Sequence, residues 1–423
     1  MTIAGIPLDF LLFALTLAGV ALFHHHTLYV AVTGMLVIAG YKLLFGDFAG
    51  VPGLPGLVGL LHHEWVTLGN LLGLLLGFAL LADHFERSRV TDLLPRFLPD
   101  DWKGGFCLLL IIFVLSSFLD NIAAAMIGGA MAHVLFRGRV HIGYLAAIVA
   151  ASNAGGAGSV VGDTTTTMMW IAGVRPGQVF EAYVGALAAI LFFGVVAARQ
   201  QHAHQPIVKD SPVGVPLDHA RLAIVAIILL AAIATNVWFN VRNPELLNAW
   251  PLIGLAVWVA LLATAGWRAP TWKLLPGALR GSIFLLSLVM CAAMMPVKAL
   301  PAASWGTTLG LGFVSAVFDN IPLTALALRQ GGYDWGFLAY AVGFGGSMLW
   351  FGSSAGVALC SMYPQGRSVG AWIRGGWHVA VGYLLGYALL MAVVGWNPEL
   401  HGRGGHAPIG AASAAAAQTS AKP

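Results

Sequence analysis

The fold is decided by two glycine-rich runs, SNAGGAGSVVGDTT (152–165) and GFGGSMLWFGSS (343–354). Each run contains Gly-Gly, then five residues, then a glycine that is followed by an oxygen-bearing side chain, Asp163 in one run and Ser353 in the other. Glycine is costly within a helix and is favoured where the backbone must unwind. The two runs therefore predict transmembrane helices that are broken near their middle, at 141–173 and 336–362.

The chain as a whole is too apolar for a water-soluble protein. Of its 423 residues 59% are hydrophobic and 9% are charged, and the mean hydropathy is +0.83. Ordinary soluble domains carry about 25% charged residues. These values exclude soluble enzymes, nucleic-acid-binding proteins and disordered proteins. Apolar runs of roughly 20 residues are typical of transmembrane helices, and we expect further spans at about 8–23, 28–45, 64–82, 179–199, 220–240, 250–267, 279–297 and 375–396.

Two other apolar stretches carry an Asp-Asn pair near their middle. FLDNI (118–122) interrupts the stretch 106–136, and VFDNIP (317–322) interrupts the stretch 305–329. A charged pair, with a proline beside it in the second case, is a poor interior for a spanning helix but suits the tip of a re-entrant hairpin. We therefore expect each stretch to return to the side of the membrane from which it enters.

The distribution of basic residues sets the orientation. With both hairpins returning, 14 of the 21 Lys and Arg residues fall on one side of the membrane and 4 on the other. Basic loops favour the cytoplasm, so the first hairpin enters from the cytoplasm and the second from outside. The predicted fold is an all-α polytopic membrane protein with two inverted-topology repeats, each with a re-entrant hairpin and a broken transmembrane helix. Its predicted organisation is N-terminal transmembrane helices (1–63), first repeat (64–199), linker (200–219), second repeat (220–396) and disordered tail (397–423).

Three aspartates, Asp120, Asp163 and Asp319, lie within these repeated elements. An ionised aspartate at the bilayer centre costs roughly 2.5–3.5 kcal/mol on insertion scales, so such residues are functional candidates. Neighbouring amide and hydroxyl side chains add the hard oxygen ligands that small cations prefer. Burial also favours the protonated form of a carboxylate. A site that holds either Na⁺ or H⁺ meets the requirement for exchange, and the tips of the four elements contain no Arg or Lys to hold an anion.

Other motifs do not indicate a cofactor or an enzyme. The run GGAGSVVGD lacks the Gly-Lys-Ser/Thr of a nucleotide-binding loop. The three cysteines, Cys107, Cys291 and Cys360, are far apart and lie in apolar runs. Consecutive residues of a helix point about 100° apart, so His24-His25-His26 is expected to be an inter-helix loop and not a metal site.

Four runs resemble the NhaD-type sodium/proton antiporters of the ion transporter superfamily: SNAGGAGSVVGDTTTTMMW (152–170), SAVFDNIPL (315–323), GFGGSMLWFGSSAGVAL (343–359) and GGWHVAVGYLLGYAL (375–389). That superfamily also contains the membrane subunits of arsenite pumps and carriers of citrate and dicarboxylates. The resemblance covers roughly residues 60–396 and implies a citrate transporter-like domain. It implies that Na⁺ binds to Asp120, Asp163 and Asp319, and that the ion and proton site is lined by Asp120, Asn121, Asn153, Asp163, Thr164, Thr165, Asp319, Asn320, Ser353 and Ser354. Related antiporters tend to have hydroxyl residues after the first Asp-Asn pair, where this chain has Ile122 and three alanines.

The function predicted from the sequence is secondary active transport, with Na⁺ (or Li⁺) exchanged for H⁺ across the inner (cytoplasmic) membrane. One alternative is an ion-coupled carrier of citrate, another dicarboxylate or an arsenite-like anion. A second alternative is a channel or sensor without coupled exchange. The expected partners are membrane lipids and the transported ions, with a homodimer as one assembly and with no nucleic acid and no cofactor.

The orientation can be checked by cysteine labelling in intact cells and everted vesicles. Arg139→Cys and Trp272→Cys are expected to react from the cytoplasm, and Arg242→Cys and Gln330→Cys from outside. Labelling of all four positions from one side would contradict the inverted repeats.

Overall fold

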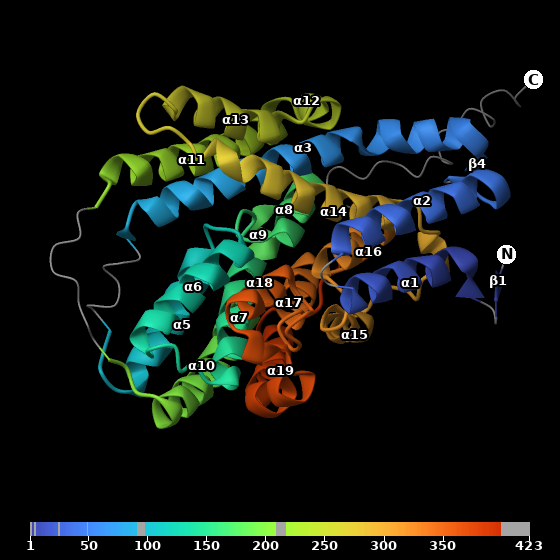
Figure 1. The fold of residues 1–423 in the computed structure, drawn as a ribbon. Coiled ribbons are helices and arrows are strands. Elements are labelled where there is room, and N and C mark those ends of the chain that lie inside the picture. The colour runs from blue at the N-terminus through green and yellow to red at the C-terminus, as the bar shows by residue number, and fades with distance from the viewer. Residues whose placement is uncertain are drawn as a thin grey trace, which may run out of the picture.

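The apolar stretches form helices in the computed structural model (Figure 1). The structure describes residues 2–3, 6–23, 26–48, 50–90, 98–208 and 217–398, so His24, His25 and the predicted tail beyond residue 398 lie outside it. The helices are α1 (Leu8–Leu22), α2 (Thr27–Phe45), α3 (Gly53–Arg87), α5 (Trp102–Ser116), α6 (Asn121–Leu135), α7 (Ile142–Ala157), α8 (Thr164–Ile171), α9 (Pro176–Phe180), α10 (Ala182–His204), α11 (His219–Arg242), α12 (Pro244–Ala249), α13 (Leu252–Thr264), α14 (Leu275–Ala293), α15 (Trp305–Ser315), α16 (Asn320–Gln330), α17 (Trp335–Gly345), α18 (Ser354–Met362) and α19 (Val369–Val393).

The remaining regular elements are short and lie either in connections between helices or ahead of α1. The 3-10 helices are η2 (Trp272–Leu274), η3 (Val297–Ala299) and η4 (Pro364–Arg367). The strands form two antiparallel pairs, β1 (Thr2–Ile3) with β2 (Ile6–Pro7) and β3 (Asp47–Phe48) with β4 (Val51–Pro52). Over the described residues the fold is therefore helical throughout its apolar part.

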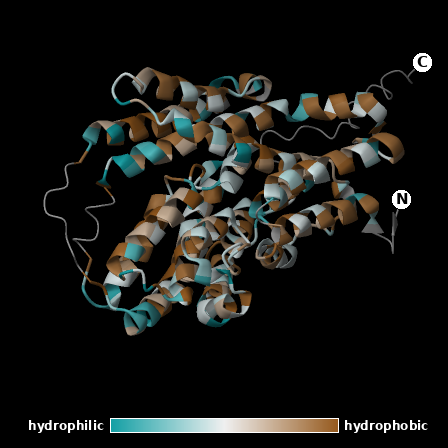
Figure 2. Cartoon of the chain, in the orientation of Figure 1, coloured by the Kyte–Doolittle hydropathy of each residue, from teal (hydrophilic) through white to brown (hydrophobic). Residues whose placement is uncertain are grey.

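Six of the described helices are long and apolar enough to cross a membrane. Hydrophobic residues dominate along most of the helices in Figure 2. The helix α3 begins at Gly53, ahead of the span expected to start near residue 64. The six candidates confirm a multi-pass membrane protein, and they are Thr27–Phe45, Gly53–Arg87, Pro176–His204, His219–Phe239, Trp272–Ala293 and Val369–Val393.

The helices form two groups, which lie beside each other in Figure 1. One group consists of α1, α2, α3, α11, α13 and α14, and the other consists chiefly of α5, α6, α7, α10, α17, α18 and α19. In the first group Asn70 Oδ1 of α3 accepts from the backbone N–H of Gly254 at 3.0 Å, and the Trp258 indole N–H donates to the Gly73 carbonyl at 3.0 Å. The first group therefore joins a helix from the first half of the sequence to helices from the second.

The helices α7 and α17 lie at the centre of the second group. Every residue of α7 from Gly143 to Ala157 is buried, and so is every residue of α17. A helix that is apolar on all faces lies either in a protein core or against lipid, and the burial of α7 and α17 places them in the core. The surrounding elements of α7 are α5, α6, α10, α17, α18 and α19.

The pairs α5–α6 and α15–α16 are helical hairpins. The Tyr144 hydroxyl donates to the Gly105 carbonyl at 2.7 Å and its ring packs on Phe136, so the start of α5 and the end of α6 lie at the same end of α7. The Gln330 amide at the end of α16 donates to the Pro301 carbonyl at 2.6 Å, just ahead of α15. These hairpins coincide with the predicted stretches 106–136 and 305–329, apart from an earlier start of α5 at Trp102.

Each hairpin is bonded to a central helix by a serine. The Ser116 hydroxyl at the end of α5 donates to the Ser152 carbonyl of α7 at 2.5 Å. The Ser315 hydroxyl at the end of α15 donates to the Val342 carbonyl of α17 at 2.8 Å. The same contact thus occurs at the same place in both halves of the chain.

Glycines allow the hairpins to approach so closely. A Cβ atom on Gly155 would collide with the backbone of Phe113, and a Cβ atom on Gly345 would collide with the backbone of Gly312. Both obstacles are backbone atoms, which cannot rotate away as a side chain can. The Gly-Gly pairs of the sequence therefore serve helix packing as well as the breaks that follow them.

Gly345→Ala is expected to destabilise the protein by about 1–3 kcal/mol, because the added methyl overpacks the contact with α15. Gly281→Ala in α14 is the matched control, since a Cβ there meets no atom within 4 Å. An alanine in an open helical position gains about 0.5–1 kcal/mol. Thermal unfolding of the purified proteins in detergent should therefore shift in opposite directions. Equal melting temperatures for the two variants would contradict the packing role of Gly345.

Candidate functional site

The first broken helix unwinds between α7 and α8, at residues 158–163. Where a helix ends inside a protein, the backbone carbonyls beyond its end have no helical N–H partner and need other hydrogen-bond donors. The Thr166 hydroxyl donates to the Ser159 carbonyl at 2.5 Å, and the Thr167 hydroxyl donates to the Val160 carbonyl at 3.0 Å. Two of the four consecutive threonines therefore donate hydrogen bonds to carbonyls of the non-helical segment.

The residue after each break caps the helix that follows. Asp163 precedes α8 with φ −143° and ψ 143°, and its carboxylate accepts from the Thr165 N–H at 3.2 Å. Ser353 precedes α18 with φ −143° and ψ 152°, and its hydroxyl accepts from the Gly356 N–H at 3.3 Å. Thr164, the first residue of α8, is half-buried. The two breaks thus end in the same local geometry.

The hairpin aspartates occupy equivalent caps. Asp120 precedes α6 with φ −53° and ψ 142°, and its carboxylate accepts from the Ile122 N–H at 3.3 Å. Asp319 precedes α16 with φ −52° and ψ 141°, and its carboxylate accepts from the Ile321 N–H at 3.1 Å. The amino terminus of a helix carries a partial positive charge that stabilises a carboxylate. All three aspartates are therefore held where their ionised form has local support.

The four capped helices pair across the two halves. The helix α6 of the first hairpin packs against α18, and α16 of the second hairpin packs against α8. The Tyr363 hydroxyl, just after α18, donates to the Gly129 carbonyl of α6 at 2.8 Å. Each hairpin therefore contacts the broken helix of the other half.

Asn153 connects three of these elements. Its carboxamide oxygen accepts from the Asn121 side chain at 3.0 Å, and its carboxamide nitrogen donates to the Ser347 hydroxyl at 3.0 Å and the Ser353 hydroxyl at 3.1 Å. Asn153 is fully buried. It therefore ties the first hairpin and the first broken helix to the break between α17 and α18.

Asp163 is the most deeply buried of the three aspartates, with 2% of its surface exposed. Its second carboxylate oxygen accepts from the Asn320 side chain at 3.4 Å, across the two halves. Asp163 also lies near enough to Asp120 and Asp319 for their charges to interact. The Thr165 hydroxyl is buried beside the carboxylate of Asp163. The carboxylate therefore lies beside an amide and a hydroxyl in the interior of the protein.

The break after α7 and the break after α17 approach each other, and we refer to this place as the crossing. The predicted ion-site residues lie around it without forming one cluster of three carboxylates. Over the described part of the chain, no three His, Cys, Asp or Glu side chains gather as ligands of one metal ion. Each aspartate caps a different helix, so an ion at any one of them takes its other ligands from amides, hydroxyls or the backbone. The segments 116–124, 152–167, 315–324 and 343–358 contain no Lys or Arg. The crossing is therefore an acidic and polar site inside an apolar protein.

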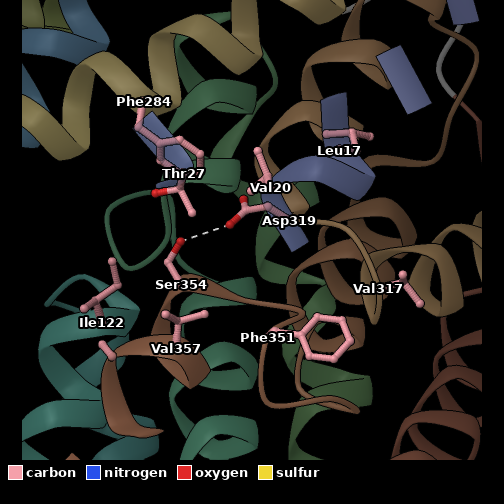
Figure 3. Close-up of a pocket in the computed structure, with 11 residues that line it drawn as sticks. Leu17, Val20, Thr27, Ile122, Phe284, Val317, Asp319, Phe351, Ser354 and Val357 are labelled. Atoms are coloured by element: carbon pink, nitrogen blue, oxygen red, sulfur yellow. Dashed lines mark hydrogen bonds between the residues drawn. The ribbon is translucent and has the colours of Figure 1, made fainter. Parts of the chain in front are cut away.

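A cavity of about 230 Å³ borders Asp319 (Figure 3). The Ser354 hydroxyl donates to Asp319 at 2.9 Å, and both residues face the cavity together with side chains from α1, α2 and α14. Asp120 and Asp163 are not among the residues that line it. The cavity therefore lies beside Asp319 and does not extend to the buried crossing.

Two contributions at the site were missed by reasoning from the sequence. Ser347 follows its Gly-Gly pair as Ala157 follows the other, so a comparison of the two runs position by position would have singled it out. The Tyr183 hydroxyl of α10 donates to the Ser117 hydroxyl at 2.7 Å, and its ring covers Gly158 at the start of the first break. No motif in the sequence connects Tyr183 with that break.

Comparison with known proteins gives consistent relatives, although no protein-family model matches the chain. It is 27% identical over 393 residues to Sodium/proton antiporter 1 of Arabidopsis thaliana, covering 83% of this chain and 66% of that protein. It is 27% identical over 361 residues to the Na(+)/H(+) antiporter NhaD of Alkalimonas amylolytica, covering 70% and 72%. It is 26% identical over 359 residues to the Na(+)/H(+) antiporter NhaD of Vibrio parahaemolyticus, covering 71% and 84%. The chain thus spans about two thirds of the length of the plant relative and more of the bacterial ones.

Asn153→Ala is expected to lower the melting temperature of the purified protein. The change leaves the amide of Asn121 and the hydroxyls of Ser347 and Ser353 without this partner, and each buried polar group left unpaired costs about 1–3 kcal/mol. Ser361→Ala is the control, because its exposed hydroxyl donates to the carbonyl of Ala358 in its own turn. Unchanged unfolding of the Asn153 variant would show that the network does not hold the halves together.

Proposed function

We propose that this chain, a member of the NhaD-type sodium/proton antiporter family, exchanges Na⁺ (or Li⁺) for H⁺ across the cytoplasmic membrane. Plant and bacterial proteins of similar sequence are named sodium/proton antiporters, which supports this function. The support from the structure is Asp163, a buried carboxylate at the crossing of two broken helices. The transported ions are Na⁺ and H⁺, and the protein acts as a transporter and not as an enzyme.

The exchange reaction follows from the competition of two cations for one carboxylate. A buried carboxylate is costly when it is ionised and unpaired, so it favours a bound cation or a bound proton. Na⁺ requires the anionic form together with neutral oxygen ligands, and the side chains that adjoin Asp163 are the Thr165 hydroxyl and the Asn320 carboxamide, which donates its N–H to the carboxylate. A proton removes the charge and with it the main attraction for Na⁺. Binding of one ion therefore excludes the other.

The proposed architecture is a pair of inverted repeats with re-entrant hairpins. It is supported by the matched caps at Asp120 and Asp319, and by the matched caps at Asp163 and Ser353. Broken helices that meet near the bilayer midplane are a recurring plan of secondary transporters, with half-helix ends at the substrate site. In this arrangement each hairpin reaches the site from its own side of the membrane.

The chemistry of the crossing disfavours the anion carrier. Citrate and dicarboxylates are multiply charged, and an anion site uses Arg, Lys or several free backbone amides. The four segments at the crossing contain no Arg or Lys, and three of the helix N-termini are already capped by aspartates. The residues at the crossing therefore suit the binding of cations better than the binding of citrate or a dicarboxylate.

The function is tested in everted vesicles that carry a ΔpH-sensitive dye. The wild-type protein is expected to dissipate the pH gradient on addition of Na⁺ or Li⁺, without citrate. Uptake of labelled citrate would support the carrier instead, and the absence of both activities would support a channel or a sensor.

Asp163→Asn is expected to insert and fold normally yet to lose Na⁺-driven proton movement at every pH, because it removes the charge on which both ions compete. Asp163→Glu is expected to retain part of the activity with a changed apparent Na⁺ affinity. Glu86→Gln, which neutralises an exposed carboxylate at the end of α3, is the matched control and should behave as wild type. The measurement is dequenching of the dye in vesicles with equal amounts of protein. Wild-type dequenching by Asp163→Asn would place the exchanged ions elsewhere.

A further inference from the structure

The cavity beside Asp319 lies between the two groups of helices (Figure 3). Leu17 and Val20 of α1 and Phe284 of α14 face it from one group. Ser354 and Val357 of α18 face it from the other, together with Phe351 of the second break and Asp319, the cap of α16. We refer to this space of about 230 Å³ as the vestibule.

The vestibule combines one negative charge with apolar walls. Asp319 is the one charged side chain among the described residues that line it, and the other polar ones are Thr27 and Ser354. Figure 3 shows Asp319 and Ser354 joined by their hydrogen bond, with Phe284 and Phe351 on different sides of them. The two phenyl rings and the aliphatic side chains make up the rest of the lining.

A bare inorganic ion would make favourable contacts with only a small part of this lining. Na⁺ binds to oxygen atoms, and three of the lining side chains supply oxygen. A water molecule takes about 30 Å³ of liquid volume, so the vestibule is several times larger than one water. Apolar walls of this extent stabilise a ligand by covering an apolar surface, which neither Na⁺ nor a hydrated proton has.

The lining matches a cation that carries an apolar group. An apolar cavity of about 150 Å³ is sufficient to bind benzene, so the vestibule has room for one ring and a charged head. Phenyl rings attract ammonium and guanidinium groups through their negative faces, and Asp319 supplies the full negative charge. Small-molecule sites typically combine apolar walls with a few polar groups that fix orientation.

We propose that the vestibule binds monovalent organic cations, in which an ammonium or guanidinium group pairs with Asp319 and a small apolar body packs against Phe284 and Phe351. Such a ligand occupies Asp319 and therefore competes with any inorganic cation that reaches this carboxylate. The binding itself does not require that the protein exchanges Na⁺ for H⁺.

The test uses benzylammonium as the probe and benzyl alcohol as its neutral counterpart, with the purified full-length protein in detergent and calorimetric titration as the readout. Benzylammonium is expected to bind at least tenfold more tightly than benzyl alcohol. Asp319→Asn is expected to remove that preference, and Na⁺ is expected to raise the apparent Kd of benzylammonium.

A second variant keeps the carboxylate and fills the space. Val357→Trp places a large side chain in the vestibule wall and is expected to weaken benzylammonium binding at least tenfold. Val393→Trp, at an exposed position of α19, is the matched control and should bind as wild type does. Melting temperatures of both variants establish that they are folded.

Two results would overturn the proposal. Equal binding of benzylammonium and benzyl alcohol would show a site for neutral apolar groups such as lipid tails. Unchanged benzylammonium binding in a folded Val357→Trp variant would place the ligand elsewhere. Binding as expected in a protein that shows no Na⁺-driven proton movement would leave this inference standing and remove the proposed exchange.

Discussion

The structure depends on the hydrogen bonds made by backbone groups that lie outside helices but inside an apolar protein. In lipid or in a packed core an unpaired carbonyl or amide costs several kcal/mol. At the first break the chain meets this constraint with the hydroxyls of Thr166 and Thr167, which bond to its carbonyls. The hydroxyls of Ser116 and Ser315 attach the hairpins to carbonyls of α7 and α17. Glycines at the adjoining positions allow the close approach that these bonds require.

The same breaks explain where the carboxylates lie. A break inside a helix creates a new helix start, and a new start favours a residue whose side chain accepts from the free backbone amides. Asp163 fills this role for α8 and Ser353 fills it for α18. Since one cap is an aspartate and the other a serine, two structurally equivalent positions differ in the charge that they can carry. The chemical asymmetry of the site therefore arises from one substitution within a shared backbone geometry.

Much of this arrangement can be predicted from the sequence because glycine, proline and buried charge have few uses within apolar helices. The breaks, the hairpin tips and the residues at their caps all follow from the Gly-Gly and Asp-Asn patterns. The contacts between helices cannot be predicted in this way, because surfaces that face lipid and surfaces that face protein are both apolar. The sequence of an apolar helix such as α13 therefore does not indicate which helix it packs against. The packing of α3 with α11, α13 and α14 across the two halves is one such contact. The role of Tyr183 depends on a contact of this kind and was missed for the same reason, whereas Ser347 could have been found by aligning the two glycine-rich runs.

The length of α3 has a consequence for its position in the bilayer. With 35 residues and a rise of about 1.5 Å per residue, the helix is about 52 Å long, whereas the hydrocarbon core measures about 30 Å. Even at a tilt of about 40°, the upper end of the usual range, it would cover about 40 Å along the membrane normal. Part of α3 therefore projects into the headgroup layer, and its last turns, with the charged residues Asp83, Glu86 and Arg87, are suited to that environment. The thickness of the bilayer is therefore expected to affect the position of α3, and with it the positions of α13 and α14, which pack against it.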